Sequence, residues 1–125
     1  MGKILYGNIK LDCLTRDSAL QELVGRLQTR QRTLLFFVNA HCFNIAQRNS
    51  IYRRVLEEAD FVLNDGVGMD IGAKLFGFKF YENLNGTDFI PLLLHEAGTN
   101  GYKVYRKRQT CTTYLRVRSL EIIAS

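Results

Sequence analysis

Two polar residues, an asparagine and an aspartate, stand where short apolar runs of the chain stop. Asn39 follows the run Leu34–Val38, and Asp65 stands just beyond Phe61–Leu63. Runs this short, without alternation, are typical of strands that are covered on both faces. Ligands of an open parallel sheet bind beyond the carboxyl ends of its strands. If these two strands are neighbours, Asn39 and Asp65 therefore face one ligand-binding crevice.

Glycine-containing turns at the same places strengthen this interpretation. Gly66 and Gly68 permit positive φ angles and let a ligand approach the backbone closely. The helix expected after them presents free N–H groups to the same crevice. A similar polar turn precedes a later helix and is formed by Asn85, Gly86, Thr87 and Asp88.

Each of these pieces also has a purely structural interpretation. An Asp-Gly pair after a strand, as in Asp65 and Gly66, is commonly no more than a turn. Asn39 can cap the helix that follows it, as can Thr87 or Asp88 for a later helix. The residues alone leave turn, cap and ligand contact open.

Sequence motifs for several other kinds of site are absent. The chain has neither GxGxxG nor GxxxxGK[ST], so the fingerprints of dinucleotide and Walker-type nucleotide sites are missing. Cys13, Cys42 and Cys111 show no metal-ligand spacing and are expected to be reduced and mostly buried. His41 and Cys42 are adjacent, but adjacency in sequence does not make a catalytic pair. We expect neither a metal nor a cofactor.

The elements that must position these residues alternate along the chain. Extended segments are expected over residues 3–11, 34–38, 61–63, 78–84 and 102–105. Helices are expected over a stretch capped by Thr15 and over residues 40–48, 51–59, 69–76 and 88–97. Pro91 fits without penalty in the first turn of a helix, which places the last cap at Thr87 or Asp88. This alternation predicts an α/β, Rossmann-like fold with a mostly parallel sheet and flanking helices.

Composition and charge restrict the class of protein. With 125 residues, 46% of them hydrophobic, the chain is one globular domain or part of a larger one. No apolar run approaches the roughly 18–20 residues needed to span a bilayer, and the first residues lack a signal peptide's apolar middle. We therefore expect a cytoplasmic location. The net charge of +5 comes entirely from residues 101–125, so the chain is a neutral body with a basic end.

Three ordered blocks of the sequence resemble those of a known family. They are an apolar strand ending in Asn-Ala within residues 37–46, an apolar strand ending in Asp-Gly-x-Gly within residues 60–68, and Gly-Thr-Asp before a helix within residues 85–88. Residues 12–15 and the helix after them also look like the opening of that family. On these blocks the chain, over about residues 4–105, is similar to the WecG/TagA/CpsF bacterial glycosyltransferases, glycosyltransferase family 26.

The resemblance implies an inverting transfer of a sugar from a UDP-sugar to an undecaprenyl-diphosphate-linked saccharide in bacterial surface polysaccharide biosynthesis. It implies action at the inner, cytoplasmic face of the membrane, with peripheral membrane contact and no metal-binding Asp-x-Asp. Asp65 matches the aspartate proposed as general base, a role in which a carboxylate takes the proton of the acceptor hydroxyl. Asn39 matches a position proposed to contact substrate. The other substrate contacts implied are Gly66, Gly68, Asn85, Gly86, Thr87 and Asp88.

Two positions and the length depart from the family. Phe37 stands where many members carry Thr, and Asn83 where many carry Arg, so the sugar and the acceptor stay undetermined. Family members are considerably longer, and their second half completes the nucleotide-sugar site. Residues 1–105 are therefore expected to be the N-terminal part of a glycosyltransferase domain with an incomplete fold. Residues 106–125 are expected to be a divergent basic tail, left by truncation or a frameshift, with a natural short form as the alternative. This chain alone is expected to be inactive.

An alternative from another class is a non-catalytic α/β binding module. Its basic tail would contact an anionic membrane or nucleic acid. The resemblance gives no basis for nucleic acid, so the anionic membrane ranks above it. Apolar surface left uncovered by a missing second half would also drive self-association into a homo-oligomer.

Overall fold

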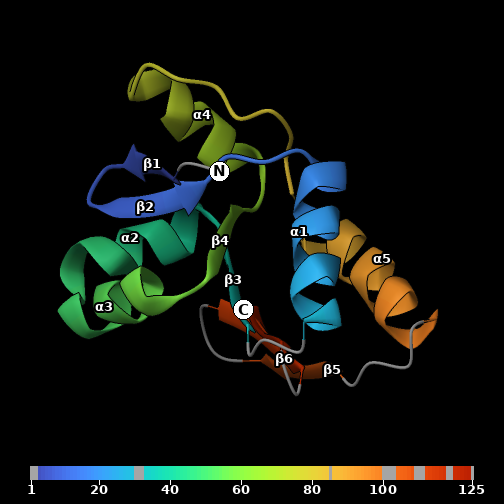
Figure 1. Ribbon diagram of the computed structural model, residues 1–125. Coiled ribbons are helices and arrows are strands. Elements are labelled where there is room, and N and C mark those ends of the chain that lie inside the picture. Colours follow the sequence, from blue (N-terminus) through green and yellow to red (C-terminus); the bar gives the residue numbers. More distant parts are fainter. Residues whose placement is uncertain are drawn as a thin grey trace.

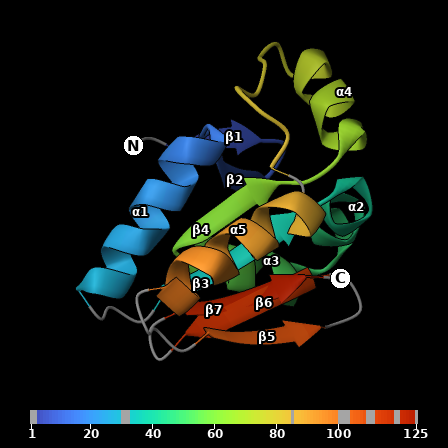
Figure 2. The ribbon, with the colours of Figure 1, turned by 90° about the vertical axis from the view of Figure 1, so that its right-hand side faces the viewer.

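Helices cover both faces of a short β-sheet in the computed structural model of the chain (Figure 1). The structure describes residues 3–29, 33–84, 86–99, 104–108, 112–117 and 120–124. The helices are α1 (Arg16–Gln28), α2 (Ala40–Arg48), α3 (Ser50–Glu58), α4 (Val67–Leu75) and α5 (Gly86–Thr99). The strands are β1 (Lys3–Tyr6), β2 (Ile9–Asp12), β3 (Thr33–Val38), β4 (Phe61–Asn64), β5 (Val104–Arg108), β6 (Thr112–Val117) and β7 (Leu120–Ala124). α1 and α5 lie on one side of the sheet, and α2 and α3 lie on the other (Figure 1, Figure 2).

β3 lies inside the sheet and pairs along both of its edges. It runs parallel to β4, with Phe37 opposite Leu63 and Val38 opposite Asn64. Beyond β3 the sheet continues with β6, which is antiparallel to β3, and β7 also pairs with β3 in parallel. The expected α/β class is confirmed, and the two strands that precede Asn39 and Asp65 are parallel neighbours. Strands from residues 104–124, at the basic end of the chain, make the sheet as a whole mixed.

The side chains of β3 alternate between two hydrophobic clusters, one on each face of the sheet. Leu35 and Phe37 belong to a cluster with α1 and α5, whereas Phe36 and Val38 belong to a cluster with the β1–β2 hairpin, α2, α3 and α4. This alternation follows from strand geometry, in which successive side chains point to opposite faces. All four side chains are buried, so β3 is covered on both faces, as its continuous apolar run predicts.

Several helices begin and end at the residues expected from the sequence. The Thr15 Oγ1 accepts a hydrogen bond from the Ser18 backbone N–H at 3.1 Å, which caps α1 as predicted. Asn49, which the sequence analysis did not single out, caps α3 by accepting from two backbone N–H groups of its first turn. α4 ends just before Gly77, whose φ of 85° lies in the left-handed region that glycine adopts readily.

Of two segments expected to be extended, one consists of two extended strands joined by a turn and the other contains no strand. Residues 3–11 form most of a β-hairpin, because Gly7 turns the chain with a φ of 60° and lets β1 pair antiparallel with β2. Residues 78–84 contain no strand. Phe78 and Phe80 pack their rings against Tyr6 instead, with ring centroids 5.8 and 5.9 Å from that of Tyr6. Aromatic packing rather than strand pairing therefore holds this segment.

α5 begins earlier than the sequence pattern predicts. Its first residue is Gly86, so the prediction that Thr87 or Asp88 caps it was wrong. Pro91 consequently lies inside the helix, where it has no N–H to donate to the carbonyl four residues earlier. The helix forms nevertheless because its inner side chains, Phe89, Ile90 and Leu93, are buried in the cluster shared with α1. Tertiary packing outweighs the local cost of the proline.

Candidate active site

Asn39 and Asp65 stand side by side at one edge of the sheet. β3 and β4 end level with each other, since Val38 lies opposite Asn64 in the parallel register. The backbone N–H of Asp65 then donates to the Val38 carbonyl at 2.9 Å, which extends the pairing by one step. The expectation that the two strands are parallel neighbours is confirmed, and Asn39 and Asp65 follow their carboxyl ends. Asp65 is half-buried at this edge.

The Asn39 side chain acts as a helix cap. Its Oδ1 accepts a hydrogen bond from the Cys42 backbone N–H at 2.8 Å, at the start of α2. This contact satisfies one of the N–H groups that the first turn of a helix leaves without a partner. The sequence left open whether Asn39 caps a helix or contacts a ligand, and in the structure it caps α2. The side chain remains half-buried at the edge that also carries Asp65.

The two glycines after Asp65 serve the backbone in different ways. Gly66 has a φ of 95°, in the region that residues with a side chain rarely adopt, and it forms the turn from β4 into α4. A Cβ atom at Gly68 would lie 2.9 Å from the Cβ of Ala40, so Gly68 lets α4 approach α2 closely. The structure thus assigns Gly68 to helix packing. Gly66, by contrast, forms the backbone turn at the candidate site.

Residues that sequence reasoning did not single out hold this turn in place. The Asn83 Oδ1 accepts a hydrogen bond from the Gly66 backbone N–H at 2.8 Å. The Asn64 Nδ2 donates to the Glu82 carbonyl at 2.9 Å, and the Leu84 N–H donates to the Asn64 carbonyl at 3.2 Å. Asn64 was detectable as a polar residue at the end of an apolar strand. Asn83 stood out only as a departure from the family pattern.

These bonds bring the third sequence block next to the first two. Because the chain at Leu84 is tied to the end of β4, α5 must begin near the Asp65 turn. Gly86 and Thr87 form the start of that helix, and Asp88 is exposed in its first turn. Asn85 lies outside the described residues. The first residues of α4 and of α5 therefore both lie near this edge, and the positive end of each helix dipole lies there too.

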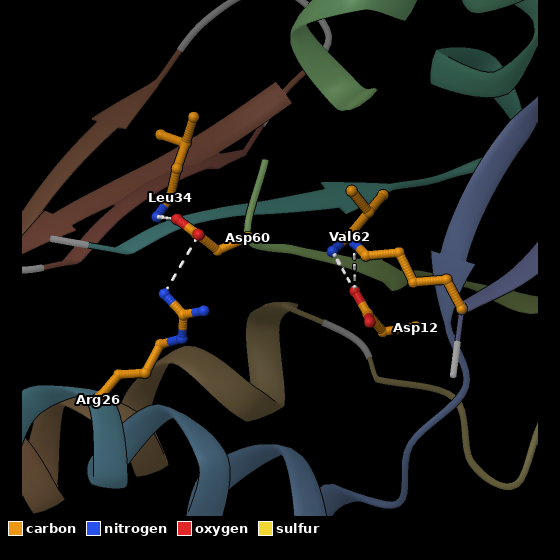
Figure 3. Close-up of polar contacts among 6 residues, drawn as sticks. Asp12, Arg26, Leu34, Asp60 and Val62 are labelled. Atoms are coloured by element: carbon orange, nitrogen blue, oxygen red, sulfur yellow. Dashed lines mark hydrogen bonds and ion pairs between the residues drawn. The ribbon is translucent and has the colours of Figure 1, made fainter. Parts of the chain in front are cut away.

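Two other carboxylates fasten the opposite end of β4 (Figure 3). The Asp60 side chain accepts from the Leu34 N–H at 2.8 Å and pairs with Arg26 at 3.2 Å. The Asp12 side chain accepts from the Val62 N–H at 2.9 Å and from the Lys3 ammonium at 3.1 Å. They border a hollow of about 450 Å³, lined by Lys3, Asp12, Glu22, Gly25, Arg26, Thr29, Asp60 and Phe61. Both carboxylates accept hydrogen bonds from strand backbone, so they hold the strands in place. Asp65 does not line this hollow.

The described part of the chain has neither a cluster of metal ligands nor a membrane-spanning helix. It contains no group of three or more His, Cys, Asp or Glu side chains arranged to hold a metal ion. Among the same residues, no helix has both the length and the apolar character that crossing a bilayer requires. Cys42 is buried and Cys13 half-buried, as expected, whereas Cys111 lies outside the described residues.

The fold and site define an α/β protein with polar residues gathered at the carboxyl edge of a parallel strand pair. The sequence profile of the glycosyl transferase WecG/TagA/CpsF family matches residues 4–106, and the chain belongs to this family. A relative from Bacillus spizizenii (strain ATCC 23059 / NRRL B-14472 / W23), named N-acetylglucosaminyldiphosphoundecaprenol N-acetyl-beta-D-mannosaminyltransferase, is 30% identical over 94 residues. The matched region is 71% of this chain and 37% of the relative. The chain therefore spans little more than a third of the relative's length.

Proposed function

We propose that this chain carries the acceptor-activating part of a glycosyltransferase, with Asp65 as the general base. The observation that carries the proposal is the place of Asp65, half-buried directly after β4 and level with the end of β3. Family membership and the name of the Bacillus relative support a sugar transfer to an undecaprenyl-diphosphate-linked saccharide. The donor in this proposal is a UDP-sugar. The reaction takes place at the cytoplasmic face of the membrane, where such an acceptor is anchored.

The proposed reaction is a single displacement with inversion at the sugar. The acceptor hydroxyl oxygen attacks the anomeric carbon of the donor as the bond from that carbon to UDP breaks. The Asp65 carboxylate takes the hydroxyl proton, and UDP leaves with the bonding electron pair. The Gly66 turn, fixed by Asn83, holds the carboxylate at the start of α4, so that base and acceptor are aligned.

We expect this chain alone to transfer sugar at no more than a background rate. Groups that stabilise charge on a leaving group often supply the largest catalytic contribution. In this proposal the groups that bind the departing UDP belong to the part of the relative that has no counterpart here. Turnover of the isolated chain at an ordinary enzyme rate, about 1 s⁻¹ or faster, would contradict this expectation. UDP release in the presence of the lipid-linked acceptor measures it.

The assignment of Asp65 is tested in a fusion of residues 1–105 to the remaining sequence of the Bacillus relative. The unsubstituted fusion provides the reference rate. Asp65→Asn in the fusion should lower kcat by about 100-fold or more, because general base catalysis contributes that much. Asp17→Asn, at an exposed aspartate in the first turn of α1, is the matched control and should leave kcat unchanged. Equal rates for both variants would show that Asp65 is not the base.

A further inference from the structure

The outer side of α4 exposes a row of large apolar side chains. Val67, Ile71 and Leu75 follow one another at the i, i+4, i+8 spacing that places them on one side of a helix. They are 66%, 57% and 84% exposed. The inner side of the same helix is buried at Met69 and Ala73. α4 therefore already has its core contacts, and the outer row is additional apolar surface.

Two more large side chains that are partly exposed follow α4 in the sequence, and basic residues accompany them. Phe76 is 49% exposed and Tyr81 is 70% exposed. Lys74 and Lys79 are both exposed, whereas Asp70, the acidic residue between positions 67 and 81, is half-buried. We call this surface the α4 face; it consists of Val67, Ile71, Lys74 and Leu75 on α4 and of Lys79 and Tyr81 in the segment that follows it. α4 lies at the periphery of the molecule in both views, away from β5, β6 and β7 (Figure 1, Figure 2).

We propose that the α4 face rests on an anionic lipid surface. A helix lying in the membrane interface buries apolar side chains below the headgroups and keeps basic residues among them. Lysine side chains extend their charge toward anionic headgroups, and tyrosine favours the boundary between the apolar and wet regions. The two lysines of the face are thus complementary in charge to an anionic bilayer.

The size and the place of the face favour a bilayer over a second copy of the chain. A nine-residue helix is about 14 Å long, which is short for the roughly 800 Å² per partner of a standard protein interface. The face begins at Val67, two positions after Asp65. Contact of the α4 face with a membrane would therefore place Asp65 near the headgroup level, where a lipid diphosphate is anchored; this step rests on the proposed function.

The experiment uses the absence of tryptophan from the chain. Leu75→Trp places a single indole on the α4 face, and Ile51→Trp places one on α3 at a side chain that is 76% exposed. Each full-length variant is mixed with vesicles of phosphatidylglycerol and phosphatidylcholine that carry bromine on their acyl chains. We expect the fluorescence of Trp at position 75 to be quenched at least twofold and that at position 51 to be unchanged. Vesicles of phosphatidylcholine alone should quench neither indole.

Each other outcome overturns the proposal. Vesicle binding without quenching at position 75 would mean that another part of the chain, such as its basic end, contacts the lipid. Concentration-dependent self-association that Ile71→Gln abolishes would assign the face to a second copy. A fluorescence change at position 75 on addition of soluble UDP-sugar alone, without lipid quenching, would assign it to the nucleotide.

The proposal can fail independently of the proposed function. Asp65→Asn should leave the quenching at position 75 unchanged, because Asp65 is not part of the α4 face. Ile71→Gln together with Leu75→Gln should reduce vesicle binding by about tenfold, since two large apolar side chains no longer enter the bilayer. A loss of transfer with intact quenching concerns the active site alone, and the reverse result concerns the membrane contact alone.

Discussion

Gly72, in the middle of α4, offers a sharp test of how that helix packs against the hairpin. A Cβ atom placed at Gly72 would overlap the Tyr6 hydroxyl and lie 3.0 Å from the ring carbon that carries it. Tyr6 is 2% exposed, and its hydroxyl donates to the Met69 carbonyl at 2.9 Å. The Tyr6 ring also packs edge-on against Phe43, so it has little room to move. Gly72→Ala should therefore disturb a buried contact despite being a small change.

The expected magnitude follows from opposing contributions. Replacing glycine by alanine inside a helix stabilises it by about 0.5–1 kcal/mol. Forcing an extra methyl group into a packed interior costs about 1–3 kcal/mol, and losing the Tyr6 hydrogen bond costs about 0.5–1.5 kcal/mol. We expect Gly72→Ala to lower the free energy of unfolding by about 2 kcal/mol. Gly25→Ala, in α1 with no atom within 4 Å of the added Cβ, should raise it by about 0.5–1 kcal/mol.

Urea unfolding followed by circular dichroism measures both variants and permits a double-mutant cycle. Tyr6→Phe removes the hydroxyl that lies nearest to the new methyl group. In that background Gly72→Ala should cost about 1 kcal/mol less than in the wild type. If Gly72→Ala stabilises the protein as Gly25→Ala does, or if the cycle shows no coupling, the packing of α4 on Tyr6 is not as described.

Two further predictions concern the first turn of α2 and the pH dependence of stability. Asn39→Ala removes the hydrogen bond to the Cys42 N–H and should lower the free energy of unfolding by about 1 kcal/mol. Asn44→Ala, at an exposed position inside the same helix, should not lower it. Equal losses of the two variants in urea unfolding would show that Asn39 is not a stabilising cap. Burial raises the pKa of Tyr6, and the nearby charge of Asp70 raises it further. Because the folded state keeps this phenol neutral, its contribution to stability is complete below the ordinary tyrosine pKa of about 10 and is lost as pH rises through the higher value of the folded state. Between pH 10 and 12 the wild type should lose stability more steeply than Tyr6→Phe; parallel pH profiles would contradict this.

Much of the site's framework could be predicted from local sequence patterns. The runs at Leu34–Val38 and Phe61–Leu63 predicted buried strands, and the residues after them predicted a shared edge. These inferences succeeded because a short apolar run and the polar residue that stops it are local features. The parallel pairing of the two strands follows from the helices α2 and α3 that connect them.

Contacts between distant segments could not be predicted in the same way. The bond from the Gly66 N–H to Asn83 joins positions 17 apart, and no residue type signals which amide will be the acceptor. Residues 78–84 were expected to be extended, yet the rings of Phe78 and Phe80 pack against Tyr6. Tyr6 is distant in the sequence and lies next to them only in the folded chain. The start of α5 was misplaced because the buried side chains of the helix, rather than Pro91, decide where it begins.

The position of β3 in the sheet has a consequence for synthesis on the ribosome. β3 can pair with β4 soon after residue 64 has emerged, but Thr33 finds its partner in β7 only at Leu120. At about 5–20 residues per second, the two partners are made about 4–17 s apart. Until β6 and β7 have been made, one edge of this strongly apolar strand has no partner from its own chain, and such edges pair readily with other chains. The yield of soluble protein should therefore depend on translation speed between residues 64 and 120, and on chaperones that cover the open edge of β3.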